Sequence, residues 1–233
     1  MNEAVIVLHT STDGQWCFVQ AENYFGWIRE AAIAYCEKEE MLQVYKTVSD
    51  TQSYDFFVVT KNTIWKKNEE SVELRMGTKL LAGAEGDEKN LWLPVRNGEK
   101  KYELKSYCIN PEDELYNGLY RGYLPYTEYN AVKLAVSLLE TPYAWGDALP
   151  YPECFSYNSE IGMDCSSTVG AVYRCFGFVM PRNTSAQQNM DWAGDVIDTF
   201  TTEKKKELFD GLKAGTLLYT PGHVMFYLGK HED

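Results

Sequence analysis

The 233-residue sequence predicts a multidomain protein in which two all-β units precede an α+β domain. In the first half, short runs of β-branched and aromatic residues alternate with Gly, Asn and Asp turns, which is typical of small barrels. From Tyr126 onwards the apolar residues recur at helical spacing, and two strand-like segments follow near the end. An order in which helices precede an antiparallel sheet is typical of an α+β domain.

Composition excludes several classes of function. The formal net charge of −12 argues against nucleic acid and anionic membrane surfaces as partners. No apolar run reaches the roughly 20 residues of a membrane span, and the N-terminus has no basic signal-peptide region. The six cysteines lack paired spacing and the three histidines are scattered. We therefore expect no complete disulfide framework, no metal and no cofactor.

The first all-β unit is predicted over residues 1–45. Its strands are expected over residues 4–8, 16–21 and from Gly26 onwards, with a turn at Asp13-Gly14. Trp16 and Trp27 are either core aromatics or ligand contacts, and the pattern leaves both readings open. A short exit over residues 29–35 and a solvated charged run over residues 36–40 follow.

The second all-β unit and a linker are predicted over residues 46–124. The expected strands, the first of which straddles the boundary, are residues 42–45, 56–60, 63–66, 72–81, 90–96 and 101–106. Asn97-Gly98 is a hairpin signal, because both residues accept the positive φ of a tight turn. Residues 110–122 are polar and rich in turn formers, and we interpret them as a linker packed on the next domain.

Residues 125–233 are predicted to form the α+β domain. Thr127 is expected to cap a helix that runs to Glu140, before Pro142. A second helix begins near Cys165, where Asp164 or Ser166 can cap it, and Gly177 closes it. Further along we expect a helix over residues 186–193, a solvated charged stretch over 203–207, a strand over 212–219 and, after Pro221-Gly222, a last strand that His223 opens.

Cys165 and His223 are the candidate catalytic pair. A thiol at a helix N-terminus lies at the positive end of the helix dipole, which favours the thiolate. Such a cysteine becomes a nucleophile if a histidine can reach it. A cysteine on a helix followed by a histidine on a strand is the chain order of papain-like thiol enzymes.

The residues around this pair resemble the successive motifs of the NlpC-type (NlpC/P60) cell-wall cysteine peptidases. The matching motifs are Tyr143-Ala144-Trp145-Gly146, Asp164-Cys165-Ser166-Ser167, Met180-Pro181-Arg182-Asn183-Thr184-Ser185-Ala186-Gln187 and Gly222-His223-Val224. The resemblance implies a papain-like domain with Cys165 as nucleophile and His223 as base. It also implies a peptidoglycan stem-peptide pocket lined by Tyr143, Trp145, Asp164, Ser166 and Thr184.

Four of the five pocket residues also have a structural interpretation. Asp164 can simply cap the helix, Tyr143 and Trp145 can be core aromatics, and Thr184 can cap the helix that follows it. The family usually has Gly where Ser167 stands. These alternatives remain open from the sequence.

The pattern of the first all-β unit resembles the bacterial SH3-like barrels attached to cell-wall enzymes, and the second unit over residues 46–124 resembles such a barrel more weakly. Together the two resemblances are closest to γ-D-glutamyl-L-diamino acid endopeptidases of the dipeptidyl-peptidase VI type, in which the first barrel limits the cleft to peptides released from glycan. They imply murein peptide recycling by a monomer with a stem peptide such as L-Ala-γ-D-Glu-diamino acid as partner. The implied compartment is the bacterial cell envelope or the exterior, and the missing signal peptide leaves the cytoplasm open.

One departure from the family concerns the third catalytic residue. In the family a polar residue about a dozen positions after the base orients its imidazole, but this chain stops at Asp233. His231 is expected at a hairpin tip roughly 26 Å from His223, too far to orient it. We therefore expect a domain truncated at its C-terminus and a first barrel that lacks its starting strand.

Two functions from different classes follow from these observations. The first is a cysteine peptidase that hydrolyses the γ-D-Glu-diamino acid bond by thiolate attack from Cys165. The second is a degenerate module that binds such peptides without cleaving them, because it lacks the orienting residue. Amidase or acyltransferase chemistry on the same thiol is a third, less specific option.

Overall fold

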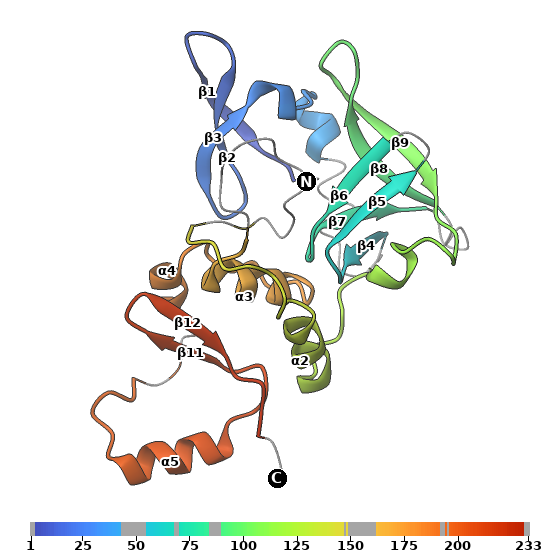
Figure 1. The fold of residues 1–233 in the computed structure, drawn as a ribbon. Helices are drawn as coiled ribbons and strands as arrows, with labels where there is room; N and C mark the ends of the chain where they lie inside the picture. Colours follow the sequence, from blue (N-terminus) through green and yellow to red (C-terminus); the bar gives the residue numbers. More distant parts are fainter. Residues whose placement is uncertain are drawn as a thin grey trace. The chain divides into compact units, whose positions relative to one another are not determined.

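The computed structural model describes residues 3–42, 55–67, 70–83, 90–146, 148, 162–191, 194 and 196–230 (Figure 1). The chain divides into two compact units. The first comprises Met1–Leu124 with Arg174–Val179, and the second comprises Pro125–Tyr173 with Met180–Asp233.

The first unit begins with a three-stranded antiparallel sheet. Its strands, in sheet order, are β1 (Ile6–Thr10), β2 (Trp16–Gln20) and β3 (Phe25–Arg29), followed by the 3₁₀ turn η1 (Glu30–Ala32). Cys17 and Val19 point to the buried face with Ile33, as the alternation along a strand requires. Trp27 lies on the other face against Phe18 and is 50% exposed. A core role for Trp27 is therefore excluded.

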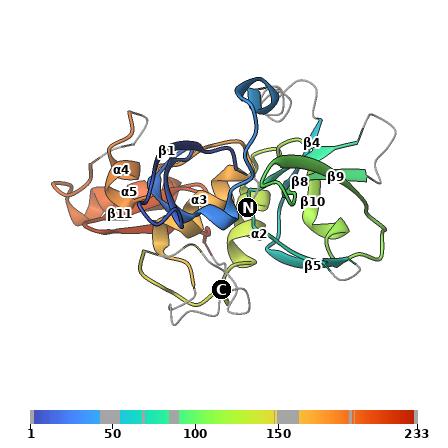
Figure 2. The same ribbon diagram turned by 90° about the horizontal axis from the view of Figure 1, so that it is seen from above.

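A second group of strands surrounds a larger core. A five-stranded sheet has the order β10 (Leu119–Arg121), β4 (Phe56–Val59), β7 (Lys79–Ala82), β8 (Asn90–Arg96) and β9 (Tyr102–Cys108), and β5 (Thr63–Lys67) pairs with β6 (Glu70–Leu74). Figure 2 shows the strand β5 opposite β8 and β9. Between them the rings of Trp65 and Tyr107 meet edge to face at 5.4 Å. The buried core comprises Val59, Trp65, Leu74, Leu80, Leu91, Leu93, Tyr107, Ile109 and Leu115.

The hairpin signal at Asn97-Gly98 is confirmed, with a different turn geometry. The Oδ1 atom of Asn97 accepts hydrogen bonds from the backbone amides of Glu99 and Lys101, both at 3.0 Å. The positive φ falls at Lys100 (65°) rather than at Gly98. The loop is thus longer than a two-residue turn, because the Asn side chain organises it in place of the glycine.

Two sequence expectations for the first unit are corrected. Residues 119–121, expected in a linker, form strand β10 and pair with β4, while Leu115 is fully buried in the core. Leu42, expected to start a strand, is helical, in a stretch described over residues 38–42, and the rest of that expected strand lies outside the described residues. Residues 110–122 therefore complete the first unit instead of leaving it.

The second unit contains four helices and one hairpin among its described residues. They are α2 (Glu128–Val136), α3 (Cys165–Arg174), α4 (Thr184–Gln188), α5 (Thr202–Gly211), β11 (Leu217–Thr220) and β12 (His223–Phe226). Thr127 caps α2 as expected, by accepting a hydrogen bond from the amide of Asn130 at 3.1 Å. Helix α2 ends at Val136, earlier than expected, where the Ser137 hydroxyl donates to the Leu134 carbonyl.

Helix α3 is the central element of the second unit. Its buried side chains Val169 and Tyr173 pack on Met180 and on Val224 of β12. The Tyr173 hydroxyl also donates a 2.5 Å hydrogen bond to the carbonyl of Gly215, just before β11. Burial raises the pKa of Tyr173 above its usual range, which keeps this donor protonated. The hairpin is thereby fixed to the helix.

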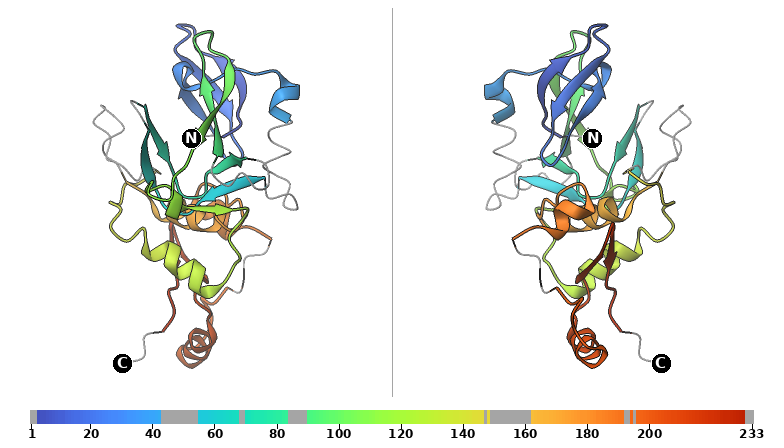
Figure 3. Two further views of the ribbon diagram at one scale, coloured as in Figure 1. Left: turned by 90° about the vertical axis from the view of Figure 1, so that its right-hand side faces the viewer. Right: turned by 90° about the vertical axis from the view of Figure 1, so that its left-hand side faces the viewer.

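One further expectation for the second unit is corrected. The helix expected over residues 186–193 is α4, which starts earlier and is only five residues long. The solvated charged stretch expected over residues 203–207 lies inside α5, which Thr201 caps and which buries none of its residues. Figures 1 and 3 show α5 apart from helices α2, α3 and α4.

The described part of the chain contains no helix that is both long and apolar enough to cross a membrane. Its cysteines Cys17, Cys36, Cys108, Cys165 and Cys175 are all free thiols.

Candidate active site

The start of α3 is built by a close contact between two backbone segments. The Met163 amide donates to the Pro142 carbonyl at 2.9 Å, and residues Tyr143 and Met163 form a parallel bridge. A Cβ at Gly162 would lie 2.2 Å from the Pro142 oxygen, so only glycine permits this approach. The bridge brings the loop that carries Tyr143 next to Asp164 and Cys165.

Asp164 caps helix α3. Its Oδ1 atom accepts a hydrogen bond from the Ser167 amide at 2.7 Å and another from the Ser166 hydroxyl at 3.0 Å. The cap leaves Cys165 as the first residue of the helix, at the positive end of its dipole. The predicted helix start and the capping role of Asp164 are confirmed.

Arg182 holds the same carboxylate with two parallel hydrogen bonds. Its Nη1 donates to Asp164 Oδ1 at 3.1 Å and its Nη2 to Oδ2 at 2.9 Å, while Nη1 also reaches the Ser166 hydroxyl at 3.1 Å. Burial would raise the pKa of Asp164. The hydrogen bonds and charge of Arg182, with the Ser167 amide, nevertheless hold that pKa below its usual value. Asp164 is therefore a charged carboxylate in a buried pair.

The Cys165 thiol is half-buried and has a hydroxyl as its partner. Its Sγ lies 3.5 Å from the Oγ1 of Thr184, a residue that is 8% exposed. The cysteine also packs against the apolar cluster that contains Val169 and Val224. The structure thus brings together two predicted site residues that are far apart in sequence.

The segment that carries Thr184 is tied to the first turn of α3. Asn183 caps α4 by accepting a hydrogen bond from the Ala186 amide at 3.0 Å, so the alternative in which Thr184 is the cap is wrong. The buried Gln187 amide donates to the carbonyls of Ser166 at 3.2 Å and Pro181 at 2.8 Å. Helix α4 is therefore held against α3 by side-chain bonds.

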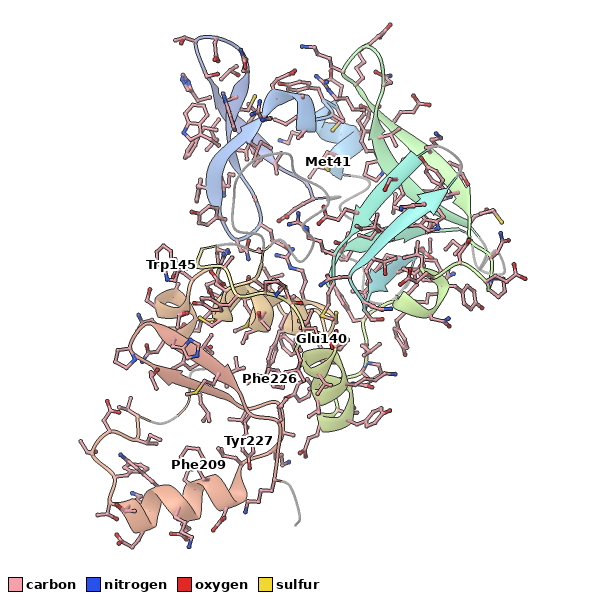
Figure 4. All side chains as sticks on the ribbon, in the orientation of Figure 1. Met41, Glu140, Trp145, Phe209, Phe226 and Tyr227 are labelled. Atoms are coloured by element: carbon pink, nitrogen blue, oxygen red, sulfur yellow. The ribbon has the colours of Figure 1, made fainter. Side chains whose placement is uncertain are left out.

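Tyr143 and Trp145 lie on the exposed loop ahead of α3, where Figure 4 labels Trp145. Their exposed fractions are 60% and 87%, which excludes the core alternative for both. Burial and the negative charges of Cys165 and Asp164 raise the pKa of Tyr143. Its phenol therefore stays protonated at neutral pH.

His223 opens β12, where it pairs with Thr220 of β11. It is exposed, whereas the next residue, Val224, is buried in the cluster that Cys165 contacts. Within the described residues the imidazole makes no hydrogen bond, neither to Cys165 nor to an orienting group. The Cys165–His223 pair stays a prediction, and His231 lies outside the described residues.

Sequence reasoning missed Arg182 and Gln187 as parts of this site. Both belong to the motif that begins at Met180, in which the resemblance assigns a pocket role to Thr184 alone. Arg182 lies 18 residues after Asp164, so no local pattern in the sequence pairs this cation with the helix-capping carboxylate. The described residues contain no group of three or more His, Cys, Asp or Glu side chains that could hold a metal ion.

Comparison with known proteins agrees with this arrangement. Residues 1–29 match the SH3 domain family of the SH3b1 type, and residues 140–232 match the NlpC/P60 family. A dipeptidyl-peptidase 6 from Lysinibacillus sphaericus is 30% identical over 101 residues, which is 43% of this chain and 29% of that protein.

Two solved structures share the fold. An NlpC/P60 endopeptidase from Photobacterium damselae subsp. piscicida superposes with a TM-score of 0.64 and 20% identity, over 88% of this chain and 40% of that one. An NlpC/P60 family protein from Bacillus cereus ATCC 10987 gives a TM-score of 0.54 and 22% identity, over 82% and 58%. The chain thus spans less than two thirds of each of these relatives.

Proposed function

We propose, from the NlpC/P60 domain over residues 140–232 and the SH3 domain ahead of it, that this chain is a cysteine peptidase of peptidoglycan stem peptides. The bond we assign to it is the amide between γ-D-Glu and the diamino acid. The name of the dipeptidyl-peptidase 6 relative supports a peptidase. The proposal includes a monomer that works at the bacterial cell envelope.

The observation that carries the proposal is the setting of Cys165. Cys165 is the first residue of a ten-residue helix and is half-buried, and the segment before this helix is bridged to the loop that bears the exposed Tyr143 and Trp145. Helix dipole and free amides at this position favour a sulfur anion and a developing oxyanion. A buried structural cysteine such as Cys175 differs, since burial raises the pKa of that thiol to about 12.

The mechanism is thiol acyl transfer. The Cys165 thiolate attacks the amide carbonyl carbon, while the Cys165 amide and the Tyr143 hydroxyl donate to the oxyanion. His223, as imidazolium, gives its proton to the leaving amine nitrogen, and the C–N bond breaks to leave a thioester. Water then attacks the thioester, His223 takes the water proton, and the carboxylate product leaves with the thiolate restored.

Substrate recognition is assigned to the polar groups beside the thiol. Asp164 and Ser166 would bind the free α-amino group of the peptide. Asp164 Oδ2 accepts one hydrogen bond, from Arg182, and a carboxylate oxygen can accept a second. Because Arg182 offsets the charge of Asp164, we expect recognition by a directed hydrogen bond more than by long-range attraction. Tyr143 and Trp145 would cover the peptide from the loop.

The test is incubation with L-Ala-γ-D-Glu-meso-diaminopimelate followed by mass spectrometry. We expect release of the diamino acid, and Cys165→Ala should abolish it. The matched control is Cys108→Ala, which removes another free but exposed thiol in the first unit. Cleavage that survives Cys165→Ala would overturn the proposal, and cleavage at a different amide would favour amidase or acyltransferase chemistry.

One observation favours a second candidate, the non-catalytic binding module. The imidazole of His223 has no hydrogen-bond partner among the described residues, whereas the imidazole of a catalytic triad needs one to fix its tautomer and orientation. Binding of the same peptide, measured by calorimetry, without any cleavage would support the module. In that case Asp164→Asn should weaken binding, whereas Cys165→Ala should leave it almost unchanged.

A further inference from the structure

We propose that Thr184 is a positioning residue for the nucleophile, which holds the Cys165 sulfur through a hydrogen bond from its hydroxyl. The inference rests on the proposed function, in which Cys165 reacts as a thiolate. It gives Thr184 a different role from the substrate contact that the motif resemblance implies.

The geometry that carries the inference is the contact between Cys165 Sγ and Thr184 Oγ1 at 3.5 Å. A hydrogen bond to sulfur is normally longer than one to oxygen, because sulfur is the larger atom. Among the described residues the Thr184 hydroxyl makes no other hydrogen bond, and the cap of α4 is supplied by Asn183. With 8% exposure, Thr184 is also shielded from water that would compete for the sulfur.

The position of this hydroxyl is fixed from both sides. Arg182, two residues earlier, binds Asp164 with two parallel hydrogen bonds, and Gln187, three residues later, binds the carbonyl of Ser166. Thr184 therefore sits between two bonds to the first turn of α3. Its branched Cβ further restricts rotation about χ1, so the oxygen has few alternative directions.

A hydroxyl suits both protonation states of the nucleophile. When the sulfur is a thiol, the threonine oxygen can accept its weak S–H bond. When the sulfur is a thiolate, the hydroxyl turns and donates, and a hydrogen bond to an anion is roughly twice as strong as a neutral one. The stronger bond belongs to the reactive form, so Thr184 favours the thiolate while it holds the side chain in one rotamer.

The neighbouring charges make such a donor useful. The Asp164 carboxylate directly precedes Cys165 in the chain. A carboxylate so close disfavours a thiolate, and the ion pair with Arg182 offsets its charge. The Thr184 hydroxyl adds direct stabilisation at the sulfur itself.

The experiment measures the reactivity of Cys165 and peptide cleavage separately in the full chain. Iodoacetamide alkylation at pH 7 is followed at Cys165 by peptide mass mapping, because Cys36 and Cys108 are also accessible. Thr184→Val, which keeps the shape but lacks the hydroxyl, should slow alkylation of Cys165 roughly three- to tenfold. Thr184→Ser should return the rate to within about twofold of the parent, since it keeps the donor.

Ser185→Ala is the matched control. It removes a hydroxyl from the next residue of α4, where Ser185 is exposed and contacts Asn183 rather than the sulfur. Its alkylation rate should equal that of the parent chain. If Thr184→Val does not fold, Thr184→Ala against Thr184→Ser isolates the hydroxyl in the same way.

The outcomes separate this inference from the proposed function. Alkylation that is equally fast in Thr184→Val and in the parent overturns the inference, whatever the peptide assay shows. Slower alkylation that serine restores supports it even if the parent cleaves no stem peptide, which would count against the function alone. Where cleavage is observed, Thr184→Val should lower kcat and leave KM nearly unchanged, because the bond is made to the nucleophile and not to the peptide.

Discussion

At the scale of single residues, the Asp164 carboxylate has two structural roles: it caps helix α3 and it forms an ion pair with Arg182 beside the proposed pocket. It accepts hydrogen bonds from the Ser166 hydroxyl, the Ser167 amide and both terminal nitrogens of Arg182. Removal of one partner from a buried ion pair leaves an uncompensated charge, which costs more than the pair itself contributes. Arg182 is therefore a structural requirement of the pocket as well as a member of the motif.

The first prediction concerns this pair. Arg182→Ala should lower the free energy of unfolding by about 3 kcal/mol, since the Asp164 charge stays buried. Arg182→Lys should recover only part of this, because an ammonium cannot make two parallel bonds. The measurement is urea denaturation at pH 7. Lys230→Ala is the control, as it breaks an exposed pair with Asp210 worth less than about 1 kcal/mol. Equal effects of the alanine variants would contradict the prediction.

The second prediction is the pH dependence of Asp164. The pKa of Asp164 in the folded chain lies below its value in the unfolded chain, so the unfolded state binds more protons at this site than the folded state does. The stabilisation is complete above about pH 4 and is lost as the pH falls through the folded pKa. Asp164→Asn should therefore be less stable than the parent at pH 7, and the two should converge in acid. Denaturation curves from pH 7 to about pH 2.5 test this, and a constant difference throughout would contradict it.

At the scale of elements, the approach of residues 142–144 to residues 162–164 determines where helix α3 begins. No side chain takes part in the closest contact, since Gly162 faces the carbonyl of Pro142. The contact joins the loop that carries Tyr143 and Trp145 to the residue that caps α3, so a displacement there would move Tyr143 and Cys165 apart.

The third prediction follows from this contact. Gly162→Ala should destabilise the chain by about 2 kcal/mol or more and should reduce cleavage of the stem peptide, because the added methyl must displace backbone. Gly194→Ala is the matched control, as its added Cβ meets no atom within 4 Å and its φ is not positive. Thermal unfolding and the cleavage assay measure the two effects. A Gly162→Ala chain with parent stability would show that the segments can separate freely.

Elements were predictable from the sequence where local chemistry determined them. Helix α3 was predicted because a capping Asp, small residues and Gly177 all indicate one helix, and β8 because its apolar run ends at an Asn-Gly turn. Helix α5 was not predicted, because its lysines and glutamates are spread around the helix and leave no clear apolar face. The capping residue Thr201 was the local signal for it. Strand β10 is three residues long between turn formers, and its pairing with β4 is a tertiary contact.

At the scale of the whole molecule, the order of β-rich and helical halves was predictable, whereas the composition of the site was only partly so. Motif resemblance selected Cys165, Asp164, Ser166 and Thr184, and the structure joins these residues. The resemblance did not predict the contact between Cys165 Sγ and Thr184 Oγ1, because that contact depends on how α4 packs against α3. Arg182 and Gln187, which hold that arrangement, became visible only with the fold.

The fourth prediction concerns the two cores. The buried cluster around Leu91 and the cluster around Val169 share no residue. Arg182→Ala should therefore increase amide hydrogen exchange in α3 and α4 while β8 and β9 keep their protection. Exchange followed by mass spectrometry resolves these segments. Equal loss of protection in both would indicate a single cooperative transition.

Helix α5 buries none of its residues, and its C-terminal end is joined to Lys230 by hydrogen bonds from the Lys230 ammonium to the carbonyl and carboxylate of Asp210. The exposed positions of such a helix can be substituted without disturbing the packed interior. It is therefore the natural attachment point for a fluorophore or an affinity tag, and the stretch where sequence drift among relatives should be greatest.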